Sequence, residues 1–184
     1  MADQINGMFS PFLRRKRVEA TKPYYNGRVL DYGCGIGTLA DLIPGDRFYG
    51  VDVDVESVQV AKINHPDHTF GLCDELPMEE MFDTIVSLAV IEHVSDPVGF
   101  IENLKIHLNQ GGKIVLTTPN PIFEPIHDLG SHIGLFSHDA LDEHESLMNR
   151  GQIAQLAKDT SMNLERYSRF LWGANQLIVL SRSA

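Results

Sequence analysis

Residues 29–37 read VLDYGCGIG, and this segment constrains the fold more than any other part of the chain. An apolar stretch that suits a buried strand ends at Asp31, and glycines then occupy every second position: Gly33, Gly35 and Gly37. Glycine lacks a Cβ and accepts positive φ, so the backbone there can approach a ligand closely. Residues 37–43 are predicted to form a helix whose free N–H groups point at the same place. The segment therefore predicts a small-molecule pocket at the carboxyl end of a first strand.

Predicted strands and helices alternate along most of the chain. The strands fall at about 28–31, 47–51, 69–73, 82–88 and 112–117, and the helices between them at about 37–43, 55–63 and 97–107. Strand 82–88 is apolar at consecutive positions, which is typical of a strand buried on both faces. A helix at 149–159 leads into strands 163–170 and 176–181, which predict an antiparallel hairpin at one edge. The pattern indicates a doubly wound α/β sheet with right-handed crossovers.

Length and charge narrow the class of protein. A chain of 184 residues is predicted to form a single domain, and its net charge of −10 disfavours nucleic acid as a partner. No apolar run approaches the roughly 20 residues of a membrane span, and no signal peptide is recognised. Cys34 and Cys73 are expected to be reduced thiols in a cytoplasmic protein. The basic run at 14–17 is interpreted as a solvated helix face.

Carboxylates follow two of the predicted strands. Asp52 ends the second strand, where a carboxylate accepts hydrogen bonds from both hydroxyls of a ribose. Asp54 competes for that role, but it is better placed to cap the next helix. Asp74 follows the third strand, next to Cys73, and could accept from an adenine amino group with Val53 as an apolar wall.

The fourth strand ends at Leu88 and Ala89, and their backbone carbonyls are expected to face the amino-acid end of a cofactor. Three segments together resemble a known family: VLDYGCGIG at 29–37, FDTIVSLAVIEHV at 82–94 and GGKIVLTTPNP at 111–121. They are similar to class I S-adenosylmethionine-dependent methyltransferases, a group that includes the ubiquinone-biosynthesis O-methyltransferases. The resemblance implies a Rossmann-like, seven-stranded, mostly parallel sheet with one antiparallel strand near the C-terminal edge.

The resemblance also implies S-adenosylmethionine as the cofactor and methyl donor. Its binding residues would be Asp31, Gly33, Cys34, Gly35, Gly37, Asp52, Val53, Cys73, Asp74, Leu88 and Ala89. His93, just past the fourth strand, is the candidate general base. Some relatives read Glu-x-x-Glu-His here, but this chain has Ala89 at the first position and retains Glu92 and His93. The sequence therefore predicts no metal site.

The predicted function is methyl transfer to a small-molecule acceptor through an O- or N-nucleophile. A lid helix within residues 1–22, expected to start at the Ser10-Pro11 pair, and a loop at 119–147 would form the acceptor pocket, with His127, His132 and His144 facing the substrate. Two alternatives stay open, because Gly35-x-Gly37-x-x-Ala40 also satisfies the dinucleotide fingerprint. One is a nicotinamide-dependent oxidoreductase on a similar sheet. The other is a non-catalytic regulatory module that binds S-adenosylmethionine. No oligomeric state is predicted.

Overall fold

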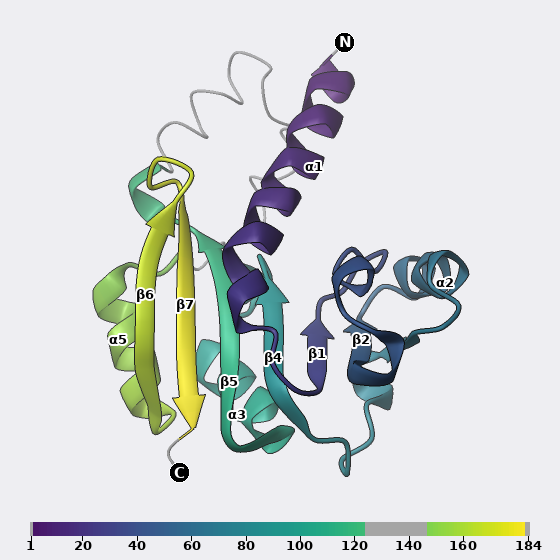
Figure 1. The fold of residues 1–184 in the computed structure, drawn as a ribbon. Helices are drawn as coiled ribbons and strands as arrows, with labels where there is room; N and C mark the ends of the chain where they lie inside the picture. Colours follow the sequence, from purple (N-terminus) through teal and green to yellow (C-terminus); the bar gives the residue numbers. More distant parts are fainter. Residues whose placement is uncertain (1, 124–146, 183–184) are drawn as a thin grey trace.

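A seven-stranded sheet of order β3-β2-β1-β4-β5-β7-β6 forms the centre of the computed structural model, which describes residues 2–123 and 147–182 (Figure 1). The strands are β1 (Val29–Tyr32), β2 (Phe48–Asp52), β3 (Thr69–Leu72), β4 (Phe82–Leu88), β5 (Leu108–Pro119), β6 (Met162–Phe170) and β7 (Asn175–Arg182). Strands β1 to β5 pair in parallel, while β7 pairs antiparallel with both β5 and β6. The predicted sheet, with its single antiparallel strand and edge hairpin, is confirmed.

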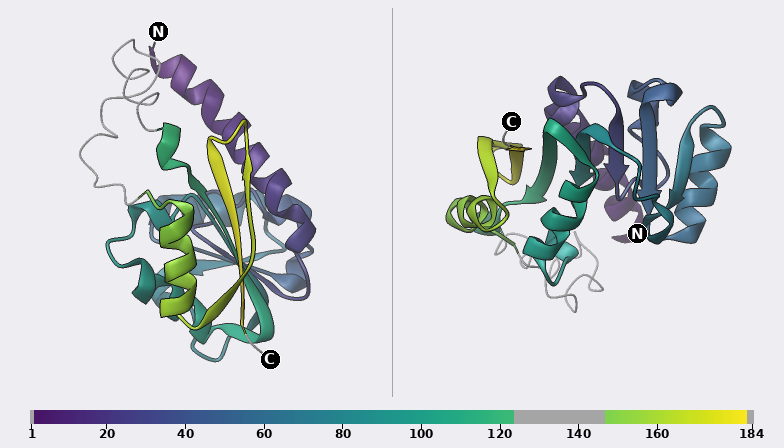
Figure 2. Two further views of the ribbon diagram at one scale, coloured as in Figure 1. Left: turned by 90° about the vertical axis from the view of Figure 1, so that its left-hand side faces the viewer. Right: turned by 90° about the horizontal axis from the view of Figure 1, so that it is seen from below.

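In the described ranges, four α-helices cover the two faces of this sheet. They are α1 (Ala2–Thr21), α2 (Val55–Asn64), α3 (Pro97–Ile106) and α5 (Arg150–Asp159). Helices α1 and α2 pack on one face, and α3 and α5 pack on the other (Figure 2). Helix α2 begins as predicted, because the Asp54 carboxylate accepts hydrogen bonds from the backbone N–H groups of Glu56 and Ser57. No helix in these two ranges is long and apolar enough to cross a membrane.

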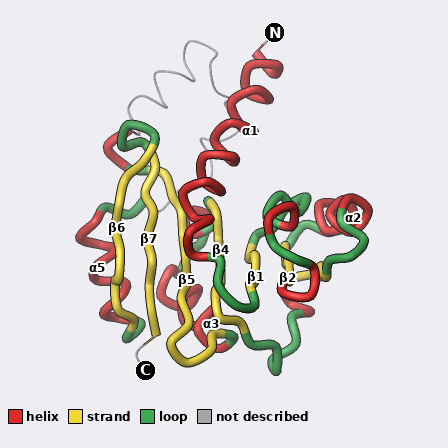
Figure 3. Tube along the Cα trace, in the orientation of Figure 1, coloured by secondary structure: helices red, strands yellow, loops and turns green. Residues whose placement is uncertain are grey.

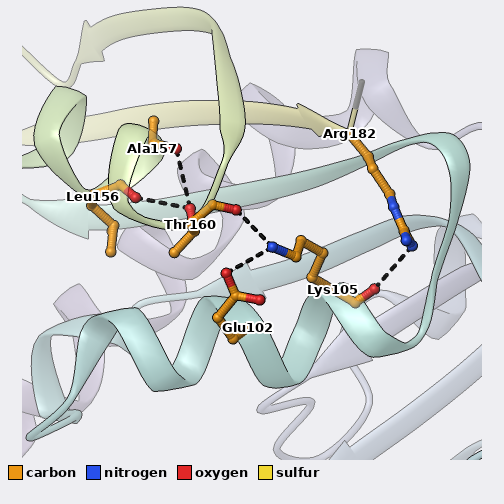
Figure 4. Close-up of polar contacts among 6 residues, drawn as sticks. All are labelled: Glu102, Lys105, Leu156, Ala157, Thr160 and Arg182. Atoms are coloured by element: carbon orange, nitrogen blue, oxygen red, sulfur yellow. Dashed lines mark hydrogen bonds and ion pairs between the residues drawn. The ribbon is translucent and has the colours of Figure 1, made fainter. Parts of the chain in front are cut away.

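Polar contacts join α3, α5 and β7 at the face away from α1. Lys105 Nζ donates to Glu102 Oε1 and to the carbonyl of Thr160, each at 2.7 Å (Figure 4). Arg182 Nη1 donates to the Leu108 carbonyl at 2.8 Å. Apolar side chains from both helices, Leu104 and Ile153 among them, are buried against β4 and β5. This packing gives β4 and β5 a rigid support beneath the pocket.

Two predicted helices differ from the structure. Residues 37–43 do not form an α-helix; they make turns and a short 3-10 helix, Ala40–Leu42 (Figure 3). Only 15 residues separate the end of β1 from the start of β2, and Pro44 with a second 3-10 helix at Gly45–Arg47 occupies part of them. Because proline disfavours helix at the residue before it, too little chain remains for a regular helix.

Helix α1 is longer than predicted. The Ser10-Pro11 pair suggested a start there, but the helix begins at Ala2 and Pro11 lies inside it. The prediction followed the local cost of proline in a helix interior, whereas the chain continues helically through it. The C-terminal half of α1 is anchored to the sheet: Val18 is buried, and Arg17 Nε donates to Asn175 Oδ1 at 3.0 Å.

Candidate functional site

The glycine loop after β1 is held by β2. The N–H groups of Gly33 and Cys34 both donate to the Val51 carbonyl, at 2.8 and 3.0 Å. The Gly35 N–H donates to Asp52 Oδ2 at 2.7 Å, and Oδ1 of the same carboxylate accepts from the Asp54 N–H at 3.0 Å. The prediction that a helix N-terminus opens at this loop is therefore wrong. Hydrogen bonds to the neighbouring strand shape the loop instead.

The three loop glycines have different surroundings. All take positive φ: +84° at Gly33, +51° at Gly35 and +87° at Gly37. A Cβ on Gly33 would lie 2.4 Å from Val90 Cγ2, and one on Gly37 would lie 2.9 Å from His65 Cδ2. A Cβ on Gly35 would meet nothing within 4 Å. Gly35 therefore presents bare backbone to open space, and the two outer glycines allow close packing behind it.

The open space belongs to a cavity of about 230 Å³ between the loop and α1. Its lining residues are Arg14, Arg17, Asp31, Gly33, Cys34, Gly35, Thr38, Leu39, Leu88 and Ala89. The structure thus brings together six of the eleven predicted cofactor-binding residues, from β1, the glycine loop and the end of β4.

The other predicted cofactor residues lie around this cavity rather than in its lining. Gly37 packs against His65 and Phe70, and Asp52 holds Gly35 from the side of β2. Val53 is 81% exposed, so its side chain is free to contact a ligand. Cys73 and Asp74 form a short 3-10 helix that follows β3, with Asp74 exposed to solvent.

Two arginines of α1 line the cavity, and the interpretation of residues 14–17 as a solvated face missed them. Arg14 Nη1 donates to Thr38 Oγ1 at 3.5 Å, while Arg17 reaches the start of β7. Arg14 nevertheless remains exposed to solvent, while Arg15 and Lys16 both pair with Glu19. Arg14 and Arg17 are three residues apart, which places them on one face of a helix. This spacing is the sequence signal that could have predicted that both side chains reach the cavity.

Burial sets the charge state of the cavity. Desolvation, with a smaller contribution from the nearby charge of Asp52, raises the pKa of Asp31 to about 7. Burial also lowers the pKa of Arg17 from its ordinary value, although the charge of Glu92 opposes this change. The thiol of Cys34 is buried as well, and desolvation raises its pKa, so it stays neutral at pH 7. The cavity therefore offers guanidinium groups on α1 opposite a carboxyl group on β1.

The turn after β4 buries the carboxyl group of Glu92. Ala89 takes a φ of +57°, and its N–H donates to the Thr117 carbonyl at 2.9 Å. Glu92, in the 3-10 helix Ile91–His93, is only 2% exposed, and burial raises the pKa of its carboxyl group. His93 is exposed to solvent and is not among the cavity-lining residues. Its role as a base stays a prediction.

The predicted acceptor residues His127, His132 and His144 lie outside the described residues, as does most of the predicted loop at 119–147. Before that gap, β5 continues to Pro119 and a short 3-10 helix occupies Pro121–Phe123. His65 and His68 are half-buried and pack against Phe70. Within 2–123 and 147–182, no three acidic, histidine or cysteine side chains are grouped to hold a metal ion.

Comparison with known proteins places this arrangement in a family. The family model for a methyltransferase domain matches residues 7–166, which include the glycine loop, the β4 turn and β5. The chain belongs to this methyltransferase family. The order of the sheet and the antiparallel β7 identify it as a class I methyltransferase domain, whose cofactor is S-adenosylmethionine.

Among curated relatives, this methyltransferase is 31% identical over 121 residues to a ubiquinone biosynthesis O-methyltransferase of Paracidovorax citrulli. The match covers 59% of the present chain and 50% of that protein, so the chain spans about half the length of this relative.

Two solved structures share the fold at low identity. A putative methyltransferase of Haloferax volcanii, solved with its Trm112 activator, has a TM-score of 0.76 and 17% identity, covering 99% of this chain and 95% of that one. Magnesium protoporphyrin IX methyltransferase of Synechocystis, solved with S-adenosylhomocysteine, has a TM-score of 0.66 and 18% identity, covering 94% and 83%.

Proposed function

We propose that this chain binds S-adenosylmethionine in the cavity beside Gly35 and transfers its methyl group to a small-molecule acceptor through an O- or N-nucleophile. The observation that carries the proposal is the bare backbone at Gly35, which faces a cavity bounded by Arg14 and Arg17. When bound, the cofactor supplies a methyl group already activated by a positive sulfonium.

The proposed contacts pair each charged group of the cofactor's methionine part with side chains of opposite charge. The guanidinium groups of Arg14 and Arg17 suit the carboxylate of the cofactor's methionine part, and Asp31 suits its ammonium group. Asp52 lies on the β2 side of the loop, where we place the ribose hydroxyls. Next along this edge of the sheet, Val53, Cys73 and Asp74 would border the adenine. Gly33, Cys34, Leu88 and Ala89 would shape the wall around the methionine part.

Because the methyl donor needs no further activation, the protein's tasks are alignment and exclusion of water. Methyl transfer is an in-line displacement, so the acceptor must be held on the far side of the methyl group. We place the acceptor beyond Leu88 and Ala89, at the carboxyl ends of β4 and β5. His93 is the base that the sequence suggests for an acceptor that carries a proton at neutral pH.

The decisive measurement is the binding of two ligands by isothermal titration calorimetry. The proposal expects S-adenosylhomocysteine to bind with one site per chain and NADH not to bind. Binding of NADH in preference to S-adenosylhomocysteine would instead support the oxidoreductase alternative. A screen of amine and hydroxyl acceptors with labelled S-adenosylmethionine then separates an enzyme from a regulatory module, since a module would bind the cofactor and methylate nothing.

A further inference from the structure

Three buried side chains at the carboxyl ends of β4 and β5 carry oxygens that no neighbour satisfies. They are Ser87, Glu92 and Thr118, exposed by 1%, 2% and 0%, and we call them the β4–β5 polar patch. Ser87 Oγ, Glu92 Oε2 and Thr118 Oγ1 have no hydrogen-bond partner within the described part of the chain. Thr117 Oγ1, on the adjacent position of β5, is a fourth such atom. Its side chain, however, points with that of Leu88 to the opposite face of the sheet, so three of the five unpartnered buried atoms of the described residues belong to the patch.

The strand register explains why the patch is compact. Ser87 of β4 lies opposite Leu116 of β5, and Thr118 is two residues further along, so both hydroxyls are on the same face of the sheet. The turn after β4 brings Glu92 to the same place. The Thr118 hydroxyl lies near the Glu92 carboxyl group, and this contact partly offsets the rise of the Glu92 pKa. That contact falls short of hydrogen-bond geometry, so both oxygens remain available.

Leaving these groups unpaired is costly. A buried donor or acceptor without a partner costs about 1–3 kcal/mol, and a charged one costs more. Native proteins keep few such groups, and they commonly mark a place where a ligand or an ordered water binds. A concentration of them at the carboxyl ends of β4 and β5 therefore indicates a subsite that is completed by something other than the residues described in the structure.

The patch and the proposed cofactor cavity both lie at the carboxyl ends of the strands, but none of the three patch side chains lines the cavity. Leu88, which follows Ser87 on β4, lines the cavity and points to the opposite face of the sheet from Ser87. The Ala89 N–H is bonded to the Thr117 carbonyl, which fixes the end of β4 against β5. Arg17 also lines the cavity, and its charge acts on the carboxyl group of Glu92. One guanidinium thus faces both the cavity and the patch.

We infer that the β4–β5 polar patch binds the reacting group of the acceptor and that the Glu92 carboxylate accepts the proton this group loses. The inference rests on the proposed methyl transfer. A buried carboxylate repels carboxylate and phosphate groups and favours a hydrogen-bond donor. The acceptor class is therefore an amine or a hydroxyl, with Ser87 and Thr118 orienting it through their hydroxyls.

The step balances without any further reactant. The nucleophile's lone pair forms the new bond to the methyl carbon of S-adenosylmethionine, and the broken C–S electron pair remains on sulfur. The acceptor's proton passes to Glu92 Oε2, which becomes a neutral carboxylic acid. A carboxyl group whose pKa is already raised by burial is suited to holding that proton.

Binding of sinefungin tests this inference without a known acceptor. In this analogue an amine-bearing carbon replaces the methylsulfonium, so its ammonium group lies on the acceptor side. The measured quantity is the ratio of dissociation constants for S-adenosylhomocysteine and sinefungin, in which contacts to the shared carboxylate and ribose cancel. We expect the wild type to prefer sinefungin and Glu92→Gln to reduce this preference by about tenfold or more.

Three further variants complete the experiment. Thr118→Val should reduce the preference by about threefold, and it tests the patch independently if Glu92→Gln fails to fold. Glu165→Gln makes the same chemical change on the exposed face of β6, where Glu165 pairs with Lys113, and should leave the preference unchanged. His93→Gln tests the base suggested by the sequence, whose side chain is exposed and does not line the cavity.

The possible outcomes separate the two proposals. If the wild type binds no S-adenosylhomocysteine, the proposed function fails. If it binds S-adenosylhomocysteine but folded Glu92→Gln and Thr118→Val keep the wild-type preference, only the role of the patch is overturned, and its oxygens are then satisfied by water. Loss of the preference in His93→Gln alone would likewise overturn the assignment to Glu92.

Discussion

Asp31 is a carboxylic acid in an environment very different from that of an exposed aspartate. It is 2% exposed at the end of β1, and burial beside Asp52 raises its pKa from 3.8 to about 7. In the unfolded chain the same carboxyl group ionises near its ordinary pKa. Its stabilising contribution is therefore complete below pH 4 and is lost as the pH rises through 7.

The variant Asp31→Asn tests this pH dependence. Asparagine does not titrate, so the free energy of unfolding of the wild type should fall relative to the variant by at most about 1.4 kcal/mol per pH unit, and by about 2 kcal/mol between pH 5 and 7, because the slope flattens as the pH approaches the folded-state pKa. Urea unfolding of both proteins at pH 5, 6, 7 and 8, without ligand, measures the difference. A difference that stays constant across this range would show that Asp31 titrates normally in the folded state.

Asp52 has two roles, and measuring both ligand affinity and stability on one variant separates them. It accepts from the Gly35 N–H, and we propose that it also binds the ribose hydroxyls. Asp52→Ala should therefore weaken binding of S-adenosylhomocysteine by a few kcal/mol and lower stability by about 1–3 kcal/mol. Asp54→Ala is the matched control, because it removes only the cap of α2 and should cost about 1 kcal/mol of stability without changing affinity. Unchanged affinity in Asp52→Ala would refute the ribose assignment.

Among the elements, the glycine loop differs most from what its local sequence suggests, since β2 holds it in place of a helix. Gly35 and Gly111 both take positive φ, and a Cβ on either would meet no protein atom within 4 Å. Each change to alanine should thus cost about 1 kcal/mol of stability through backbone strain.

Only Gly35→Ala should also reduce affinity for S-adenosylhomocysteine, by tenfold or more, because its methyl group would project into the cavity. Calorimetry measures the affinity of both variants for S-adenosylhomocysteine. Urea unfolding measures the loss of stability that backbone strain causes in each. Equal affinities in the two variants would place the ligand away from Gly35.

Helix α1 is the second element whose role depends on the face it turns inward. Arg14 lines the cavity, while its neighbour Arg15 pairs with Glu19 on the surface. Arg14→Gln should weaken binding of S-adenosylhomocysteine about tenfold, since it removes a charge-assisted hydrogen bond to the carboxylate. Arg15→Gln should leave binding unchanged, because exposed pairs of this kind contribute about 0.5 kcal/mol to stability and nothing to the cavity. Equal effects in the two variants would argue against a carboxylate clamp on α1.

At the scale of the whole molecule, the cavity joins elements that are distant in sequence. It is bounded by α1, β1, the glycine loop and the end of β4, so a ligand there links the N-terminal helix to the centre of the sheet. Binding to the folded state alone at 100 times the dissociation constant stabilises by about 2.7 kcal/mol. For a chain of 184 residues, this raises the midpoint of thermal unfolding by about 5–10 °C. S-adenosylhomocysteine should produce this shift in a thermal scan and NADH should not.

The sequence by itself determined the class of fold and the position of the pocket. Consecutive apolar residues at 82–88, the Asp54 cap and the alternate glycines at 33–37 are local signals, because each depends on residues near one another in the chain. The same locality explains the failure at 37–43. A helical pattern was present there, but the short connection to β2 and the hydrogen bonds to Val51 and Asp52 decided its conformation.

Only the tertiary structure decided which polar side chains face the site. Arg14 and Arg17 line the cavity because α1 packs across the sheet, and Arg15 does not, although the sequence contains all of them in one basic run. Glu92 is buried and His93 exposed because the turn after β4 folds against the end of β5. Side-chain direction at these positions is set by contacts between segments far apart in the chain, which no local pattern encodes.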